Sequence, residues 1–248
     1  ILLSASDIDG DNLTFSLESD ATNGTVVIDG SFATYTPNEN YNGDDSFIFT
    51  VSDGDLSDSA TVTLTIDSVN DAPVLATISD VIFDEDSSTT ITVSGLDVDG
   101  NALSFSITDG IDIIVTLIDT DITFSAPDNF NGSEIFTVSV TDGEYIDSQS
   151  FSVTVQTLND APVATTGLSG TTNEDQFIVI ALSGSDIDGD NLTFSLELDA
   201  THGSVIIDGS LATYTPASDY NGDDSFIFTV SDGDLSDSAT VTLTIEPI

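Results

Sequence analysis

Carboxylates in repeated turns are the residues of this sequence whose chemistry is clearest. "DIDGDNLTFS" occupies 7–16 and recurs unchanged at 186–195, and the related "DVDGNALSFS" occupies 97–106. Clustered carboxylates with Asn and backbone carbonyls nearby suit Ca²⁺, which takes roughly six to eight oxygen ligands in a flexible geometry. The turn is no EF-hand loop, because its Gly comes too early and Thr108 stands where that loop needs Glu. Taken singly, each Asp beside a Gly is also an ordinary turn former.

The balance of charge narrows the possible partners. The chain has 45 acidic residues, no Lys or Arg, one His and no Cys. Nucleic acids and anionic membranes would be repelled, so cations are the expected partners, and disulfides and thiolate metal sites are excluded. An alternative interpretation is adaptation to high salt. That would place acids on exposed strand positions, where this sequence has mostly Ser and Thr, and the two interpretations can hold together.

Three copies of one unit make up the chain. Asp7, Asp97 and Asp186 are 90 and 89 residues apart, and the segment at 41–66 returns unchanged at 220–245. The pattern predicts repeats at 1–69, 70–158 and 159–248, of which the first lacks its first strand. Because the chain begins without Met and without a signal peptide, we expect a processed piece or an excerpt of a longer protein.

Within each repeat the hydrophobic period is two. In "TVTLTI" (61–66), Val62, Leu64 and Ile66 alternate with Thr, as in half-buried strands. Asp-Gly, Asn-Gly and Pro signals separate such segments, and about seven short strands per repeat is the size of an immunoglobulin-like sandwich. No apolar run has the length of a membrane-spanning helix, so we expect no membrane insertion.

Longer segments carry a resemblance to a known family. "EDQFIVIALSGSDIDGDNLTFSL" (174–196) resembles the first half of a cadherin repeat, "FTVSDGDLSDSATVTLTI" (49–66) its second half and "VNDAPV" (69–74) its linker. The pattern is similar to the cadherin-like tandem repeats of large bacterial surface and secreted proteins, many of them adhesins. The resemblance implies an all-β fold of tandem immunoglobulin/cadherin-like β-sandwiches arranged end to end, an extracellular location on the bacterial surface, and Ca²⁺ at the junctions between neighbouring repeats.

The resemblance also implies a ligand set for each junction. Between the first and second repeats it comprises Asp45, Asn70, Asp71, Asp97, Asp99 and Asp142. Between the second and third it comprises Glu85, Glu134, Asn159, Asp160, Asp186, Asp188 and Asp232. Residues that would face a preceding repeat are Asp7, Asp9 and Asp53, and those that would face a following one are Glu174 and Asp224. The linker departs from the cadherin pattern, because Ser68 and Thr157 replace its first Asp and it is one residue shorter, which predicts fewer or weaker ions. The fifth position of the turn also varies, with Asn101 where the other repeats have Asp11 and Asp190.

The residue types argue against an enzyme. The single His202 aligns with Asn23 in the first repeat, and the absence of Lys, Arg and Cys removes most nucleophiles and oxyanion donors. Two functions remain: a calcium-stiffened spacer that presents other domains, and repeats that themselves bind a glycan or like chains. Near-identity of the first and third repeats favours the spacer, whereas exposed, coplanar Tyr rings would favour glycan binding. A further alternative is a fibre, in which another molecule donates the edge strand that we expect at "NEDQFIV" (173–179) and that the first repeat lacks.

Overall fold

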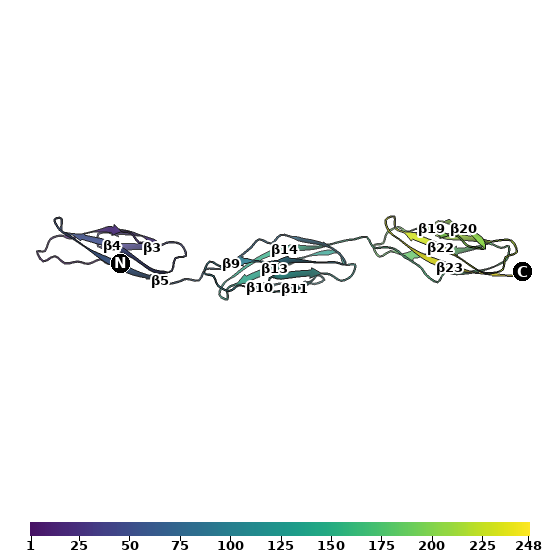
Figure 1. Ribbon diagram of the computed structural model, residues 1–248, viewed down its shortest axis with the longest axis horizontal. Coiled ribbons are helices and arrows are strands. Elements are labelled where there is room, and N and C mark those ends of the chain that lie inside the picture. The colour runs from purple at the N-terminus through teal and green to yellow at the C-terminus, as the bar shows by residue number, and fades with distance from the viewer. The chain divides into compact units, whose positions relative to one another are not determined.

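The computed structural model describes all residues, 1–248, and contains strands but no helix (Figure 1). The chain divides into two compact units. The first comprises Ile1–Val81, Thr89–Phe124 and Glu134–Val153, and the second comprises Ile82–Ser88, Ser125–Ser133 and Thr154–Ile248. The first unit therefore holds the first repeat and most of the second, and the second unit holds the third repeat with the remaining segments of the second.

The first repeat has two small antiparallel sheets, with strand orders β1-β4-β5 and β2-β3. Residues 41–66 form a long hairpin in which Gly43 pairs with Ile66 and Ser52 with Ser57. Its strands are β1 (Thr14–Ser19), β2 (Gly24–Asp29), β3 (Phe32–Pro37), β4 (Gly43–Ser52) and β5 (Ser57–Ile66).

The second repeat has the larger sheet β10-β13-β14-β7, the smaller sheet β11-β12-β8 and the short pair β6-β9. Its strands are β6 (Val74–Leu75), β7 (Val81–Asp84), β8 (Ser88–Thr92), β9 (Gly95–Leu96), β10 (Ser104–Ile107), β11 (Ile114–Ile118), β12 (Asp121–Ser125), β13 (Gly132–Thr141) and β14 (Ile146–Gln156).

The third repeat repeats this plan, with sheets β16-β23-β22-β19, β17-β21-β20 and β15-β18. Its strands are β15 (Val163–Ala164), β16 (Ser169–Asn173), β17 (Ile178–Ala181), β18 (Gly184–Ser185), β19 (Thr193–Leu198), β20 (Gly203–Asp208), β21 (Leu211–Pro216), β22 (Gly222–Ser231) and β23 (Ser236–Glu246). The expected number of about seven main strands is confirmed in the second and third repeats.

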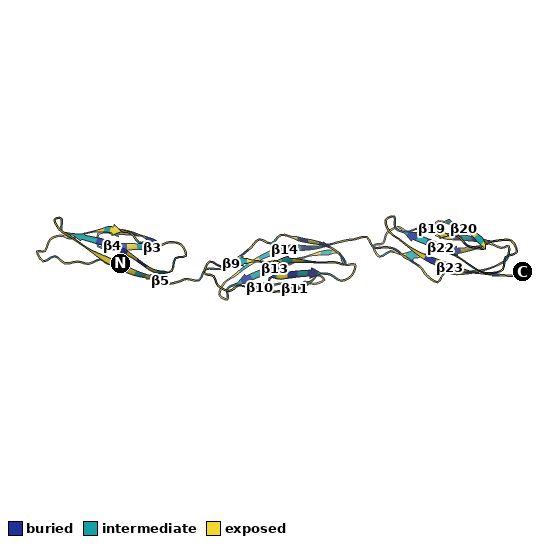
Figure 2. Cartoon of the chain, viewed as in Figure 1, coloured by how far each residue is buried: buried dark blue, intermediate teal, exposed yellow.

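Alternate residues of the long strands form the core of each sandwich, as the period of two predicts. On β22 and β23, Phe226, Phe228, Val241 and Leu243 are buried, whereas Ile227 between the two Phe residues is half-buried and Thr242 between Val241 and Leu243 is exposed (Figure 2). The middle repeat adds an edge-to-face aromatic contact, with the Phe124 and Phe136 ring centroids 5.2 Å apart.

The expected edge strand at 173–179 is wrong in its bounds. Residues Ser169–Asn173 pair in parallel with β23, whereas Ile178–Ala181 pair with β21 of the other sheet. The chain crosses between the sheets from Glu174 to Phe177, and Asp175 takes a positive φ of 60° there. Asp tolerates the left-handed region, so this turn ends one strand and redirects the next.

A carboxylate at the start of each long hairpin, buried at Asp45 and half-buried at Glu134 and Asp224, organises the loop opposite it. Asp224 Oδ1 accepts the backbone N–H groups of Thr201 and Ser225, at 3.0 and 2.9 Å. Its Oδ2 accepts the N–H of His202 and the Tyr214 hydroxyl, both at 2.9 Å. Asp45 makes the same four contacts in the first repeat, and Glu134 accepts three backbone N–H groups in the second.

These contacts give Asp45, Glu134 and Asp224 a role inside their own repeats, where the sequence predicts calcium ligands. Burial alone raises the pKa of each carboxyl, but the hydrogen bonds outweigh it, and each pKa lies below its usual range. Burial, followed by the hydrogen bond to Asp45, raises the pKa of Tyr35 to about 12. Because these carboxylates accept hydrogen bonds from residues of their own repeats and from no linker residue, we leave the three residues out of the ligand set proposed below.

The ring of Tyr214 leaves no room for a side chain at Gly203. A Cβ at Gly203 would lie 2.3 Å from Tyr214 Cε2 and 2.6 Å from the backbone oxygen of Thr215. We expect Gly203→Ala to cost about 1–3 kcal/mol, as overpacking of a core does, and to lower the melting temperature of the third repeat by several degrees in differential scanning calorimetry. Ser204→Ala, at the next and exposed position, is the control and should leave the melting temperature within error.

Asp224→Asn tests the loop-organising carboxylate. The amide places N–H groups against backbone donors, so the variant should melt below the wild type at pH 7. A lowered native pKa means that Asp224 stabilises the fold above its unfolded pKa of about 3.9 and loses this effect as pH falls through the native pKa. The gap in melting temperature should therefore narrow as the pH falls below about 4. Asp223→Asn removes the same charge from an exposed neighbour, and an equal, pH-independent gap in both variants would contradict the assigned role.

Candidate metal centres

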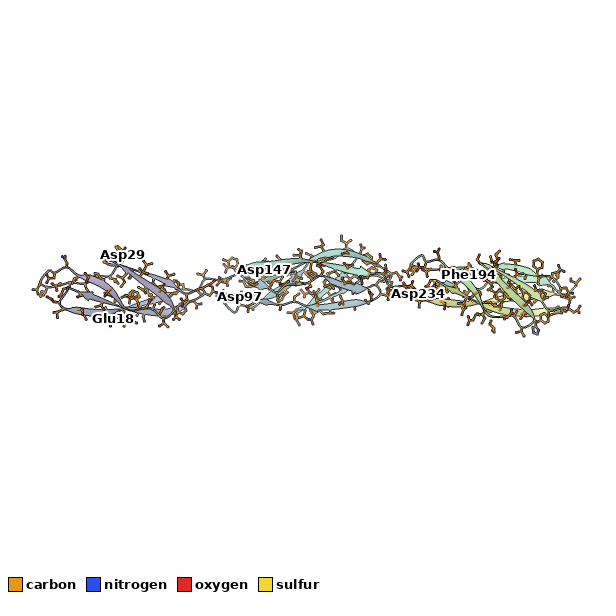
Figure 3. The ribbon with its side chains drawn as sticks, turned by 90° about the horizontal axis from the view of Figure 1, so that it is seen from above. Glu18, Asp29, Asp97, Asp147, Phe194 and Asp234 are labelled. Carbon is orange, nitrogen blue, oxygen red and sulfur yellow. The ribbon has the colours of Figure 1, made fainter.

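The first linker is held against the second repeat by the residues that the sequence singles out. Asn70 donates from Nδ2 to Asp142 Oδ2 at 2.7 Å, and the N–H of Asp71 donates to Asp99 Oδ2 at 2.7 Å. Both contacts lie within the first compact unit. Figure 3 shows Asp97 at the end of the second repeat that this linker enters.

Asp97 is the buried member of the first site, with 8% of its surface exposed. Its Oδ1 accepts the N–H groups of Asp99 and Asn101, at 3.0 and 3.1 Å, which forms the turn. Its Oδ2 is buried and has no hydrogen-bond partner. A buried carboxylate oxygen without a partner is costly, so a cation is the natural complement at this position.

Two acidic residues that the sequence analysis does not single out also border the first site. Glu39 and Asp67 line a hollow of about 340 Å³ together with Asp71 and Asp99. Since Glu39 lies in the loop after β3 and Asp67 directly after β5, both come from the end of the first repeat nearest the linker. Asp67 could have been suspected from its place beside the linker, whereas Glu39 carries no such signal.

The second site has the same hydrogen bonds between its linker and the repeat that follows. Asn159 donates from Nδ2 to Asp232 Oδ2 at 3.0 Å, and the N–H of Asp160 donates to Asp188 Oδ2 at 2.8 Å. Asp186 Oδ1 accepts the N–H of Asp190 at 3.2 Å, and its Oδ2 is buried without a partner. The two linkers therefore use equivalent residues in equivalent contacts.

Glu85 brings a further carboxylate to the second site from the second repeat. It is 2% exposed; its Oε1 accepts the N–H of Leu158 at 2.8 Å, and its Oε2 is buried without a partner. Carboxylate oxygens of Glu85, Asp160 and Asp188 lie within 4.8 Å of one another, as do those of Asp186, Asp188 and Asp190. All of these residues belong to the second compact unit.

The electrostatics of the second site show an excess of negative charge. Burial raises the pKa of Asp160, and the charges of Asp86, Asp188, Glu85 and Asp186 raise it further. Asp86 is a member that sequence reasoning missed, although it stands beside Glu85; its Oδ1 accepts the N–H of Asn129 at 2.9 Å. The carboxylates crowd together with no cationic side chain to balance them.

The donors of both sites fit a hard divalent cation. They are oxygens only, from carboxylates and Asn side chains, and four of them are buried without a partner, on Glu85, Asp97, Asp160 and Asp186. Such a donor set suits Ca²⁺ better than a metal that prefers nitrogen or sulfur. A bound Ca²⁺ would supply the positive charge that the side chains lack.

One contact distinguishes the two sites. Asn101 donates from Nδ2 to Asn70 Oδ1 at 2.6 Å, so a side-chain amide occupies an oxygen of the first linker. The equivalent residue of the third repeat is Asp190, which has no such donor and instead adds a carboxylate to its cluster. At this position the first site therefore has one carboxylate fewer, and one oxygen of its linker is already engaged.

The remaining predicted residues form equivalent turns that lie apart from these two clusters. Asp7 Oδ1 accepts the N–H groups of Asp9 and Asp11, as Asp97 Oδ1 does in the second repeat. Asp53 Oδ1 accepts the N–H groups of Asp55 and Leu56, and these hydrogen bonds hold its pKa below the usual range. Glu174 Oε1 accepts the N–H of Ile248 at 2.8 Å, which repeats the contact of Glu85.

Comparisons with known proteins agree with this architecture. The family model of the bacterial Ig domain matches residues 1–65, 70–156 and 159–244. The sequence has no match among curated proteins. Extracellular cadherin domains 1–5 of protocadherin gamma B2 superpose with a TM-score of 0.60 at 15% identity, over 97% of this chain and 54% of that one. Domains 1–3 of mouse protocadherin-24 give a TM-score of 0.54 at 14% identity, over 100% and 92%.

At these identities the solved structures establish the fold alone. They confirm the predicted all-β class of tandem immunoglobulin/cadherin-like sandwiches. The chain spans about half the length of the protocadherin gamma B2 chain. The structure contains no helix long and apolar enough to cross a membrane. Because its family model covers all three repeats almost from end to end, the chain belongs to the bacterial Ig domain family.

Proposed function

We propose that this chain is a non-catalytic extracellular spacer of a bacterial surface or secreted adhesin, and that Ca²⁺ bound at the repeat junctions stiffens it. The observation that carries the proposal is the pair of deeply buried carboxylates, Asp97 at the first junction and Glu85 at the second, each with one oxygen lacking any partner. The other oxygen of each carboxylate already accepts hydrogen bonds from backbone N–H groups, so the unpartnered oxygen is available to an ion.

The proposed ligands are the residues that converge on each linker. For the first junction they are Asn70, Asp71, Asp97, Asp99 and Asp142. For the second they are Glu85, Asn159, Asp160, Asp186, Asp188 and Asp232, with Asp190 as an additional carboxylate. By the same reasoning, the equivalent turn residues Asp7, Asp9 and Asp53, and Glu174, would serve junctions with further repeats.

Charge explains why a cation would stiffen the linkers. Without an ion, carboxylates from the linker and from both neighbouring repeats repel one another at short range. With an ion, the same groups attract a common centre, and the linker loses freedom that it has in the ion-free form. The repeats would then hold other domains of a longer protein away from the cell.

Glycan binding by the repeats finds less support. Tyr214 is fully buried, Tyr35 is half-buried, and the hydroxyls of both donate to the carboxylates inside their repeats. The aromatic stack near the surface is His202 on Tyr220, with ring centroids 4.2 Å apart, and Asn23 replaces that His in the first repeat. The exposed, coplanar Tyr rings that would favour a glycan are not a feature of the fold.

Calcium should stabilise the folded chain through these sites. Binding to the folded form alone adds about 2.7 kcal/mol per site at a hundredfold excess over Kd, and extracellular modules often bind with Kd in the range of about 10⁻⁴–10⁻³ M. We therefore expect the melting temperature to rise through millimolar CaCl₂ and to fall back with EDTA. An equal rise with NaCl of matched ionic strength would assign the effect to screening and remove the support for a metal site.

Glu85→Gln should have opposite effects with and without calcium. Gln keeps Oε1 as an acceptor for the N–H of Leu158 and replaces the unpartnered charged oxygen by a neutral amide. In EDTA the variant should melt at or above the wild-type temperature, because a repulsive charge is removed. In saturating CaCl₂ it should melt below the wild type, with weaker binding at one site in isothermal titration calorimetry. The control is Asp208→Asn, which changes an exposed acid at the end of β20 that belongs to neither ligand set. A Glu85→Gln variant that behaves alike in both conditions would exclude Glu85 as a ligand.

The fifth position of the turn should set the difference between the two junctions. Asn101→Asp frees the Asn70 oxygen and adds a carboxylate, so the first site should bind Ca²⁺ at least several-fold more tightly. Asp190→Asn should weaken the second site in the same measurement. Calorimetric titration of the two variants and the wild type resolves the sites, and unchanged affinities in both would make this position a turn residue only.

A further inference from the structure

The outer edge of β5 in the first repeat is open, whereas the equivalent edges of the other two repeats are covered. The larger sheet of the first repeat has the order β1-β4-β5 and ends at β5. In the second repeat β7 lies beside β14, and in the third repeat β16 lies beside β23. Strand β16 pairs with β23 in parallel, in the register that sets Ser169 opposite Thr242. The first repeat therefore presents an edge that its two neighbours fill with a strand of their own.

The same hairpin sequence is less well buried where this strand is absent. Residues 41–66 and 220–245 are identical, so their exposure can be compared position by position. Three side chains on the core side of β23 are at most 2% exposed: Val241, Leu243 and Ile245. The same three side chains on β5 are half-buried: Val62, Leu64 and Ile66. Since the sequences are the same, the difference arises from the segments that cover the hairpin in the third repeat.

The backbone groups that β16 uses have free equivalents on β5. In the third repeat the N–H of Thr242 donates to the Leu168 carbonyl at 3.1 Å, and the N–H of Glu174 donates to the carbonyl of Glu246 at 2.8 Å. Thr63 is the equivalent of Thr242 in the first repeat, on the side of β5 that faces no strand. No side chain accepts its N–H group. An open edge of this kind can receive an added strand.

We propose that the open edge of β5, with the half-buried face beside it, is a docking site for an extended segment of the sequence type of residues 168–179 (LSGTTNEDQFIV). The third repeat shows the bound arrangement on the identical hairpin. There Leu168 and Ile178 pack against the core. Ile178 pairs with Tyr214, which is fully buried, whereas the equivalent Tyr35 is half-buried. Main-chain hydrogen bonds would hold such a segment, and the two apolar side chains would select it.

The two ends of the occupant follow from what the first repeat already contains. The place of residues 180–182 is held by residues 1–3, where the Ala33 N–H donates to the Ile1 carbonyl at 2.9 Å. Before β16, the short pair β15-β18 needs Gly184, because a Cβ there would lie 3.0 Å from the Val163 carbonyl oxygen, and the first repeat has Ala5 at that place. Within a folded third repeat the segment is already paired with β23 and β21. The occupant is therefore a free segment and not a folded repeat.

The docked segment would also bring a carboxylate to the first junction. Directly after β16, Glu174 Oε1 accepts the N–H of Ile248 at 2.8 Å, and after β7 Glu85 accepts the N–H of Leu158 at 2.8 Å. Val69 is the equivalent residue of the first repeat, and it has no such Glu. This step rests on the proposed function: if the first junction holds Ca²⁺, the segment and the ion should strengthen each other's binding by the same factor.

The test is a titration of a fluorescein-labelled 168–179 peptide, amidated at its C-terminus, with the purified 248-residue chain in EDTA. At about 0.15 M NaCl the Debye length is about 8 Å, which limits the repulsion between like charges. Fluorescence anisotropy should show saturation at one peptide per chain, and hydrogen exchange should show added protection at Thr63 and Thr65. The L168N/I178N peptide keeps the length and charge and should bind at least tenfold more weakly. Equal binding of the two peptides, no saturable binding, or protection confined to other strands would overturn the proposal.

Two variants of the chain locate the edge. Thr63→Pro removes the outward N–H of β5 and should weaken peptide binding at least tenfold, since Pro is tolerated on an edge strand whose N–H faces outward. Thr63→Ser keeps that N–H and should bind as the wild type does. Melting curves in EDTA confirm that both variants are folded. Wild-type affinity in the Pro variant would contradict the assignment to β5, and the hydrogen-exchange result decides the matter if that variant does not fold.

Calcium separates the docking site from the proposed metal site. In saturating CaCl₂ the peptide should bind at least several-fold more tightly than in EDTA, and the E174Q peptide should lose this gain while binding in EDTA at least as tightly. Binding in EDTA with no gain from calcium for either peptide would refute the added ligand and leave the docking site standing. Stabilisation of the chain by calcium with no peptide binding in either condition would refute the docking site and leave the metal sites standing.

Discussion

Uncompensated negative charge is the constraint on which the rest of this structure depends. The chain has 45 carboxylates and neither Lys nor Arg, so backbone N–H groups, hydroxyls and side-chain amides are the main partners that its acids can find within it. Turns supply N–H groups in clusters, which is why the acids gather there and the strands carry Ser and Thr. The structure divides these acids into those whose oxygens the backbone satisfies and those with one oxygen left over.

The unpartnered oxygens belong to carboxylates whose two oxygen atoms have different roles. Asp97 uses Oδ1 to form its turn and leaves Oδ2 buried and unpartnered, and Asp186 and Glu85 do the same with their own two oxygens. One oxygen therefore stabilises the fold of the repeat, and the other is available at the linker. This arrangement lets each sandwich fold on the strength of its core and hydrogen bonds, and under the proposed function it would leave the junction responsive to a cation.

The sequence predicts the strands and the core well because a period of two is a property of single strands. It predicts the junction turns as well, since identical acidic motifs recur beside the linkers. The sequence could have predicted that Asp45 points into its own repeat, because Asp45 shares a face of β4 with the buried Phe47 and Phe49. The crossing at Glu174–Phe177 was not, because the change of sheet depends on one positive φ at Asp175, which the apolar pattern does not encode. Nor could the hydrogen bond from Asn101 to Asn70 be foreseen, since it depends on the placement of the linker.

Charge couples the junctions to the repeats beside them. If carboxylates at the junctions hold Ca²⁺, each bound ion lowers the net charge of the chain by two as well as restraining a linker. The remaining acids of both neighbouring repeats then repel one another less. A divalent cation would therefore stabilise the repeats beside a junction as well as the junction itself, through charge alone and with no conformational change passing between them.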